Sequence, residues 1–372
     1  MRYQNVCLEG FGYQLPEQVV TSGELEQWLA PVYQRLRLPS GRLELMTGIR
    51  ERRLWPPDTR GSAQSVLSAE QALETTGVPR AQIGALVHGS VCRDHLEPAT
   101  ACRVHHELRL PSDCQIFDVS NACLGLLNGL LLVANMIELG QIRAGLVVGT
   151  ENCRPLVETT VRELNEDESL TRERIKLAVA SLTIGSASCA FVLTDRELSR
   201  TDNRVLGGAC RAETRFHGLC HSGADEAGAQ MQPLMQTDSE QLMHEGIATG
   251  AATYAQFLAE LGWQTADVAK VFTHQVGVAH RRAMLGALGI DEARDFSTVE
   301  LLGNTGSVAL PISMAIGIEQ GHLTAGEQVA LLGIGSGINS VMVAVDWQKS
   351  LCRASTETSG TSPQRVDGLV GS

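Results

Sequence analysis

The chain has 372 residues, of which 43% are hydrophobic, and it carries a formal net charge of −12 at pH 7. This length and apolar content can bury one large core or two ordinary ones, while the excess of negative charge argues against a nucleic-acid-binding surface. There is no charged-then-apolar leader, no stretch that could span a membrane and no C-x-x-C pair among ten scattered cysteines, so we expect a reduced, soluble, cytoplasmic protein without a zinc site or disulfide framework.

Taken in order, the chain reads as two similar halves. Matching segments are an apolar opening at 5–10 and 203–208, a helical pattern ending on glycine at 63–77 and 248–262, a strand at 83–87 and 268–272, and closing strands at 146–148 and 189–193, then at 329–332 and 341–345. Recurrence in the same order indicates an internal duplication. Strands that alternate with helices predict mixed or parallel sheets with helices on their faces.

We therefore expect an N-terminal half at 1–198 and a C-terminal half at 203–347, joined by a short polar stretch. An insertion at about 156–180 has no counterpart in the second half. Its charged, helical composition predicts an exposed cap, or simply a solvated surface helix. The tail at 348–372 is polar and rich in Gly, Ser and Thr, which predicts disorder.

The most informative stretch runs from 115 to 149, where a polar turn leads into an apolar helix starting at Cys123. That helix is too short and too interrupted by polar residues to cross a membrane, so we expect it in the core. A cysteine at the amino end of a buried helix lies in the positive end of the helix dipole, which favours the thiolate. Cys123 is therefore a candidate nucleophile. The alternative is a small buried apolar residue.

Two further residues are predicted to meet Cys123. Cys123 and Asn304 each stand 17 positions before a glycine, Gly140 and Gly321 respectively. In a pseudo-twofold fold these matching positions face one pocket, and the loop after the strand at 268–272 brings His274 to the same place. Cysteine, histidine and asparagine together indicate nucleophilic acyl chemistry. Alternatively, His274 is structural and Asn304 belongs to a turn.

A glycine-rich loop, Gly333-Ile-Gly-Ser-Gly337, follows the strand at 329–332. Glycines let the backbone approach a ligand closely, and its N–H groups can hold an oxyanion. A phosphate-binding loop is the competing interpretation, but the Lys-Ser/Thr pair of such loops is missing.

These motifs carry a family resemblance. The segments that carry it are 118–123 (DVSNAC), 273–275 (THQ), 303–305 (GNT), 333–337 (GIGSG), and 47–49 (TGI) followed by two arginines. They resemble the active-site motifs of the thiolase superfamily, in its ketoacyl synthase III branch, from Met1 to about Trp347. The resemblance implies an α/β thiolase fold, a duplicated five-layer α/β/α/β/α sandwich, in a protein that is usually a homodimer. It also implies that His274 and Asn304 polarise the thioester carbonyl and the enolate, and that the backbone N–H groups of Cys123 and Ser336 form the oxyanion hole.

Within this branch the chain is most similar to the OleA group, which joins two fatty acyl-CoA molecules head to head. Segments 52–55, 93–98, 272–276 and 331–339 carry this likeness. It implies that Glu97 is the base that removes the α-proton of the second acyl chain, acting in the neighbouring subunit's site. A desolvated carboxylate is suited to that task. Without the resemblance, Glu97 would be an ordinary surface carboxylate.

The resemblance thus predicts a non-decarboxylative Claisen condensation that yields a β-keto acid, as in olefin or β-lactone biosynthesis. Coenzyme A enters with the substrate, and no separate cofactor or metal is expected. Arg50, Arg52 and Arg53 could bind CoA phosphates or could form a solvated charged face. Expected partners are fatty acyl-CoA, a second copy of the chain and downstream pathway enzymes. The alternatives are a decarboxylative synthase III that uses malonyl-ACP and a non-catalytic subunit of a heterodimer.

Overall fold

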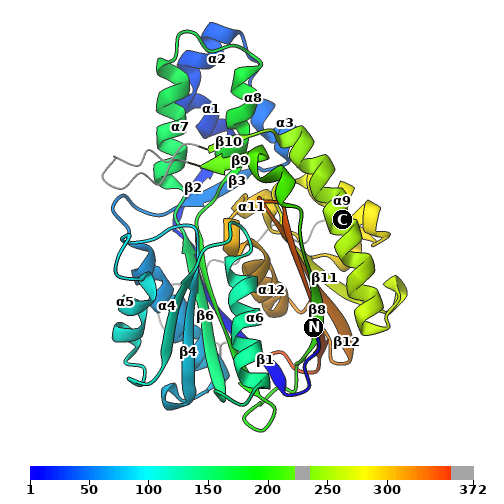
Figure 1. The fold of residues 1–372 in the computed structure, drawn as a ribbon. Coiled ribbons are helices and arrows are strands. Elements are labelled where there is room, and N and C mark those ends of the chain that lie inside the picture. The colour runs from blue at the N-terminus through cyan, green and yellow to red at the C-terminus, as the bar shows by residue number, and fades with distance from the viewer. Residues whose placement is uncertain (223–234, 353–372) are drawn as a thin grey trace.

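The computed structural model describes residues 1–222 and 235–352, so most of the predicted tail lies outside the described residues (Figure 1). The strands are β1 (Val6–Gln14), β2 (Gln18–Thr21), β3 (Glu51–Leu54), β4 (Ile83–Gly89), β5 (Gln115–Val119), β6 (Ala144–Glu151), β7 (Ala187–Asp195), β8 (Arg204–Ala212), β9 (Cys220–Ser222), β10 (Met235–Thr237), β11 (Lys270–Thr273), β12 (Glu327–Gly335) and β13 (Asn339–Trp347). The helices are α1 (Ser22–Trp28), α2 (Ala30–Leu36), α3 (Arg42–Thr47), α4 (Gly61–Thr76), α5 (Thr100–Leu108), α6 (Gly125–Glu138), α7 (Arg154–Glu166), α8 (Arg174–Ala178), α9 (Ser239–Leu261), α10 (Val278–Leu288), α11 (Val299–Leu302) and α12 (Ala309–Glu319).

The main sheet of the described residues has the strand order β11-β12-β13-β8-β1-β7-β6-β4-β5. β4 pairs in parallel with β5 and β6, and β11 pairs in parallel with β12. The other neighbours are antiparallel. β2 pairs with β3 and β9 with β10 in two small separate sheets. The remaining strands of residues 6–195 form one half of the main sheet and those of 204–347 the other, and the two halves meet where Cys7 of β1 faces Arg204 of β8. The mixed sheet matches the prediction.

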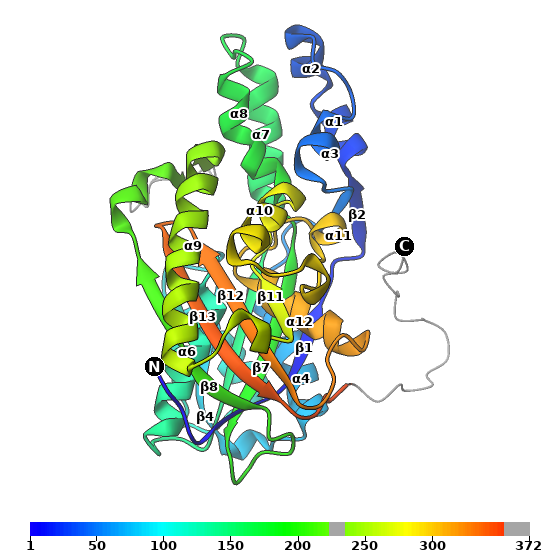
Figure 2. The ribbon, with the colours of Figure 1, turned by 90° about the vertical axis from the view of Figure 1, so that its right-hand side faces the viewer.

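Helices α6 and α12 form a central layer between the two half-sheets (Figures 1 and 2). Every residue from Ala309 to Ile318 of α12 is buried, as expected for a helix that is apolar on all sides. The central core joins these helices to strands of both halves, for example through Leu130, Ile316, Phe191 and Val343.

The two remaining helix layers lie on the outer faces. Leu73 of α4 and Val104 of α5 pack on β4, β6 and β7, while Phe257 of α9 and Leu285 of α10 pack on the strands of the second half. Helices therefore cover and separate the half-sheets in five layers, which confirms the predicted α/β/α/β/α sandwich.

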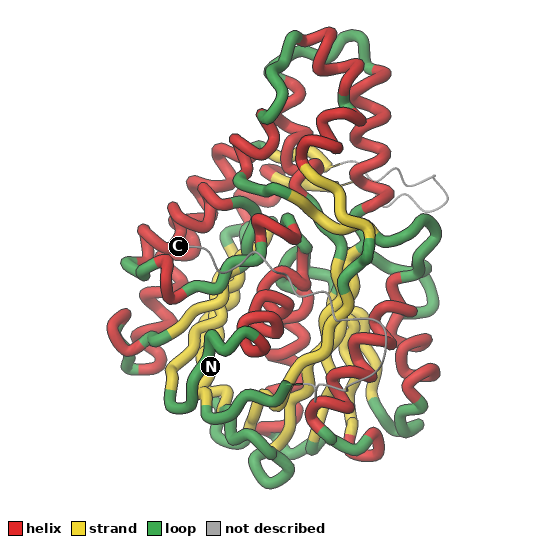
Figure 3. The backbone as a smooth tube through the Cα atoms, turned by 180° about the vertical axis from the view of Figure 1, so that it is seen from behind, coloured by secondary structure: helices red, strands yellow, loops and turns green. Residues whose placement is uncertain are grey.

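A helical cap stands above the sandwich, built from α1, α2, α3, α7 and α8 (Figures 1 and 3). The predicted insertion corresponds to α7 and α8. Val157 and Leu164 of α7 pack with Leu29 and Val32 in a separate apolar cluster, so α7 is not merely a solvated surface helix. Within the described part of the chain, no helix combines the length and apolarity needed to cross a membrane.

The second half ends differently from the first. In the first half β5 extends the sheet beyond β4, whereas beyond β11 only a single parallel bridge joins Val271 to Asp295. The Asp295 carboxylate accepts hydrogen bonds from the N–H and hydroxyl of Thr273, at 3.1 and 3.0 Å. The side chain of Asp295 therefore bonds to the backbone N–H of Thr273 at the edge where a further strand next to β11 would bond. This difference between the halves affects the residues around His274, described below.

Candidate active site

Cys123 lies in the turn between β5 and α6. The prediction that it stands in the first turn of the helix is wrong by a short margin, because α6 begins at Gly125, two residues later. Ala122, just before it, has φ 46°, in the left-handed region. Such a conformation typically costs on the order of 1–3 kcal/mol in a residue other than glycine. The sharp turn it makes presents Cys123 at the junction of the two halves.

Burial, not the helix dipole, dominates the resting state of this thiol. Burial raises the pKa of Cys123 to about 12, with smaller contributions from Glu151 and Cys220. The expectation that the helix start favours a resting thiolate is therefore wrong. The free energy needed to remove a thiolate from water is larger than the stabilisation that the nearby N–H groups provide. Cys123 rests as a thiol, and its proton must leave during acyl transfer.

The predicted glycine-rich loop is in fact the end of β12, as far as Gly335, followed by the turn into β13, and it packs directly on Cys123. A Cβ atom at Gly335 would lie 3.2 Å from Leu124 Cγ and 3.4 Å from Cys123 N, so only glycine allows this approach without displacement. Asn339 Nδ2 donates to Asn121 Oδ1 at 3.2 Å and so ties the two loops together. This placement keeps the backbone of Ser336, the predicted oxyanion donor, next to the nucleophile turn; its role stays a prediction.

Asn304 is fixed by its backbone on the other side of the site. Its N–H donates to Thr183 O at 2.9 Å, and its carbonyl accepts from Gly185 N–H at 2.9 Å. Its side-chain Oδ1 accepts from Gly306 N–H at 3.0 Å. The side chain of Asn304 is thus more constrained than in an ordinary surface turn.

His274 follows β11, and its N–H donates to Leu332 O of β12 at 3.1 Å. Burial, with a smaller effect of His280, lowers the pKa of His274 to about 3. Its ring is therefore neutral at physiological pH, and Nδ1 has no hydrogen-bond partner among the described residues. A neutral ring can donate a hydrogen bond to a carbonyl oxygen without adding a buried charge.

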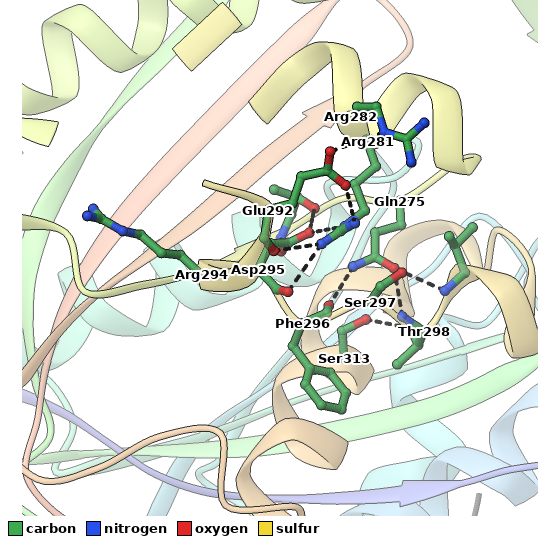
Figure 4. Close-up of polar contacts among 12 residues, drawn as sticks. Gln275, Arg281, Arg282, Glu292, Arg294, Asp295, Phe296, Ser297, Thr298 and Ser313 are labelled. Atoms are coloured by element: carbon green, nitrogen blue, oxygen red, sulfur yellow. Dashed lines mark hydrogen bonds and ion pairs between the residues drawn. The ribbon is translucent and has the colours of Figure 1, made fainter. Parts of the chain in front are cut away.

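The residues on both sides of His274 are held by one segment of chain (Figure 4). Asp295 accepts from Thr273, as described above, and also from Arg281 Nε at 2.5 Å. Gln275 Oε1 accepts from Thr298 N–H at 2.9 Å, and its Nε2 donates to Phe296 O at 2.7 Å. His274 is therefore clamped through its neighbours while its own ring remains available.

Glu97 lies apart from this group. Its loop, residues 90–99 between β4 and α5, begins at the site, where Val91 N–H donates to Glu151 at 3.2 Å. Glu97 itself is exposed on the surface. The structure thus packs the Cys123 turn against the end of β12, and the strand β12 also accepts the N–H of His274. Glu151, which acts on Cys123, contacts the loop of Asn304. Glu97 is exposed, and the joint role of these residues stays a prediction.

The three predicted phosphate ligands also separate. Arg50 is exposed, whereas Arg52 is 1% and Arg53 9% exposed. Arg52 donates inward to Ser22 and Leu182, and Arg53 donates to Pro16 O. Buried guanidinium groups cannot meet CoA phosphates at the surface, so the prediction is wrong for Arg52 and Arg53, and Arg50 alone remains a candidate.

Sequence reasoning missed two features. One is Glu151, which is buried at the end of β6 beside Cys123. A charged residue at the end of a strand that is otherwise almost entirely apolar was the signal that could have found it. The other is the set of hydrogen bonds that Asp295 and Gln275 make around His274. These two residues are isolated polar positions in the sequence, and no motif predicts that they bond to each other's segments.

Two family models match the chain. The N-terminal domain of thiolase matches residues 62–184, and the C-terminal domain of 3-oxoacyl-[acyl-carrier-protein] synthase III matches residues 258–347. Together they include Cys123 in one match and His274 and Asn304 in the other.

Relatives extend over nearly the whole chain. The acyl-CoA:acyl-CoA alkyltransferase of Shewanella oneidensis is 42% identical and that of Xanthomonas campestris 34%, each over 93% of this chain and 100% of the relative. The β-ketoacyl-[acyl-carrier-protein] synthase III of Sphingopyxis alaskensis is 26% identical over 90% of this chain and 96% of its own length. A crystal structure of Xanthomonas campestris OleA matches with a TM-score of 0.88 and 34% identity over 93% of this chain and 98% of that chain. With this identity, coverage and fold, the chain belongs to the acyl-CoA:acyl-CoA alkyltransferases, the OleA group of acyltransferases in the thiolase superfamily.

Proposed function

We propose that this protein condenses two fatty acyl-CoA molecules without decarboxylation, through an acyl group bound to Cys123. The observation that carries the proposal is the packing of the buried Cys123 turn against Gly335 at the end of β12, with Glu151 linking Cys123 to the loop of Asn304. It is supported by the 42% identity to an acyl-CoA:acyl-CoA alkyltransferase. Solved structures of Xanthomonas campestris OleA include one with cerulenin bound and forms with a substituted glutamate or histidine.

In the first step the Cys123 sulfur attacks the carbonyl carbon of an acyl-CoA. A carbon–sulfur bond to Cys123 forms, the bond to the CoA sulfur breaks, and CoA leaves as a thiol with the proton that Cys123 has lost. The negative charge on the carbonyl oxygen would be held by the N–H groups of Cys123 and Ser336. Loss of one such donor typically costs on the order of 10²–10³ in rate.

In the second step Glu97 takes the α-proton of a second acyl-CoA. The carbanion attacks the Cys123 thioester, the new carbon–carbon bond forms, and the Cys123 thiolate leaves and regains a proton. His274 and Asn304 would donate hydrogen bonds to the oxygen that becomes negative. Hydrolysis of the resulting β-ketoacyl-CoA would consume one water and release CoA and the β-keto acid.

Products made from a single long-chain acyl-CoA test the proposal. With acyl-CoA as sole substrate, mass spectrometry should find two equivalents of free CoA per β-keto acid, or the ketone left when that acid loses carbon dioxide. Malonyl-ACP should not be needed. Product that forms only when a malonyl thioester is added would contradict the proposal and favour the decarboxylative alternative.

We further propose that the protein is a homodimer. The described sheet ends at β5, whose outer edge is unpaired. On the α6 side of that edge, Phe117 is 39% and Leu132 42% exposed, and Leu96, next to Glu97, is 58% exposed. A free strand edge beside exposed apolar side chains invites pairing with a second copy of the same edge about a twofold axis. Such pairing would carry each Glu97 loop toward the neighbouring subunit.

Complementation between two inactive variants tests this arrangement. Cys123→Ala and Glu97→Gln subunits, co-expressed with two different affinity tags and purified as the heterodimer, should regain about half of the wild-type condensation rate, since one of two symmetric sites is complete. That site combines Cys123 of one subunit with Glu97 of the other.

The control pairs the Glu97→Gln subunit with a Cys123→Ala/Glu97→Gln double variant, which leaves no Glu97 in either position. If the first heterodimer is as inactive as this control, Glu97 does not act across the interface.

The setting of the reaction follows from the same proposal. We place it in the cytoplasm, which agrees with ten free cysteines, and in a pathway toward long-chain olefins or β-lactones with downstream enzymes that consume the β-keto acid. Coenzyme A enters as part of the substrate, and we propose no separate cofactor.

A further inference from the structure

Glu151 is a buried carboxyl group for which the reaction above has no use. It ends β6 and is 5% exposed. Its Oε1 atom lies 3.2 Å from Val91 N, 3.3 Å from Ser307 N and 2.5 Å from Ser307 Oγ. One oxygen atom therefore contacts two different loops.

Both loops carry residues of the proposed mechanism. Val91 lies near the start of the loop that leads to Glu97, and Ser307 follows Asn304 by three positions. The contact with the second loop is close: a Cβ at Gly306, where φ is 56°, would lie 3.1 Å from Glu151 Cγ. The carboxyl group thus joins the root of the Glu97 loop to the loop of Asn304.

The Ser307 hydroxyl stands between this carboxyl group and Gly89. Ser307 Oγ lies 2.9 Å from the carbonyl oxygen of Gly89 and 2.5 Å from Glu151 Oε1. A serine hydroxyl has a single proton, and the carbonyl can only accept. The two oxygen acceptors therefore share the proton of Ser307, and Glu151 Oε1 accepts the two backbone N–H groups as well. Burial raises the pKa of Glu151, and these hydrogen bonds act in the opposite direction.

We propose that Glu151 is a positioning residue that fastens the loop of Glu97 to the loop of Asn304 beside Cys123. The inference rests on the proposed function, because it gives Glu151 a task in a reaction that uses all three residues. In a dimer, the Glu151 carboxyl group of one subunit would position Asn304 in the active site of that subunit. It would also position the Glu97 loop, which enters the active site of the other subunit.

Ionisation of Glu151 should change the pKa values of the titratable groups that face it. These titratable groups are the thiols of Cys92 and Cys123, and a negative Glu151 raises the pKa of each. When Glu151 is ionised, a negative charge stands beside Cys123 and opposes formation of its thiolate. The rate at which iodoacetamide alkylates Cys123, measured against pH, therefore reports on Glu151 without any condensation.

The Glu151→Gln variant keeps an acceptor oxygen for the two backbone N–H groups and stays neutral at every pH. Its Cys123 alkylation midpoint should move to lower pH by on the order of one unit, because a like charge is removed. Glu151→Ala should lose condensation by on the order of 10²-fold, as expected when catalytic groups are misplaced, and Glu151→Gln should restore much of that loss. Peptide mass spectrometry identifies the alkylated cysteine.

Ser307→Ala provides a milder variant in case Glu151→Ala fails to fold. It removes the hydroxyl between Glu151 and Gly89, and condensation should fall while acylation of Cys123 continues. Ser68→Ala is the matched control, since it removes a buried hydroxyl that donates to Ser188 Oγ in an outer layer, and it should condense like the wild type.

Two results would overturn the inference: an alkylation profile of Glu151→Gln that is the same as wild type, or condensation by Glu151→Gln as poor as by Glu151→Ala. Failure of the proposed function would give a different result, because the wild-type protein would then make no product from acyl-CoA alone. The alkylation profile of Glu151→Gln does not depend on condensation and would still test the role of Glu151.

Discussion

The Glu97→Gln protein is expected to take up an acyl group on Cys123 and then fail to form the carbon–carbon bond. Glutamine keeps the size of the side chain but cannot accept the α-proton, and a positioned base typically contributes ~10²–10⁴-fold. Acylation needs no such base, so the acyl-enzyme should accumulate. Intact-protein mass spectrometry after mixing with a long-chain acyl-CoA would show the added acyl mass, while product analysis would show the loss of condensation.

Glu107→Gln is the matched control for this variant, because it neutralises another exposed carboxylate, on α5, that forms an ion pair with Arg103. It should condense normally. Near-normal condensation by Glu97→Gln itself would remove Glu97 from the mechanism, as would be expected if decarboxylation of a malonyl donor generated the carbanion.

Cys123→Ala should abolish covalent acylation and, with it, all product. Removal of the nucleophile from comparable acyl-transfer enzymes costs on the order of 10⁶ in kcat. Alanine fits in the turn between β5 and α6 without new contacts, so circular dichroism should show an unchanged fold. Incubation with radiolabelled acyl-CoA, followed by denaturing electrophoresis, measures the bound label.

The control is Cys102→Ala, which removes another partly buried cysteine, on α5. This variant should acylate like the wild type. Label that persists on Cys123→Ala would assign the acyl group to one of the other nine cysteines.

The fold could be predicted from local signals that depend on few contacts. Gly77 and Gly262 end α4 and α9 with φ 67° and 72°, as the sequence predicted, because glycine adopts this conformation without strain. The start of α9 was harder to see. It begins at Ser239, nine residues before the predicted pattern, since Gly246 interrupts the helical signal and its packing partner, Ile334, is distant in sequence.

The candidate site was predicted in its residues but not in its electrostatics. Repeat symmetry placed Cys123 and Asn304 at matching positions, and Glu151 acts on Cys123 while it contacts the loop of Asn304. The raised pKa of Cys123 depends on how deeply packing buries its sulfur, which no motif records. Burial also explains the wrong prediction for Arg52. It lies in a run of charged residues and was therefore predicted at the surface, but packing buries it. Glu97 shows the opposite limit, because the role that we propose for it requires a second subunit and the fold of one chain leaves it exposed.

The clamp around His274 has a mechanical consequence. The segment that holds Thr273 and Gln275 through Asp295 and Thr298 continues through α11 to Asn304. One short run of chain therefore links the two proposed hydrogen-bond donors, His274 and Asn304. Asn304 is also bonded to Thr183 and Gly185 of the first half. The distance between the two donors is thus held from both halves, and we expect a bound alkyl chain to change it little.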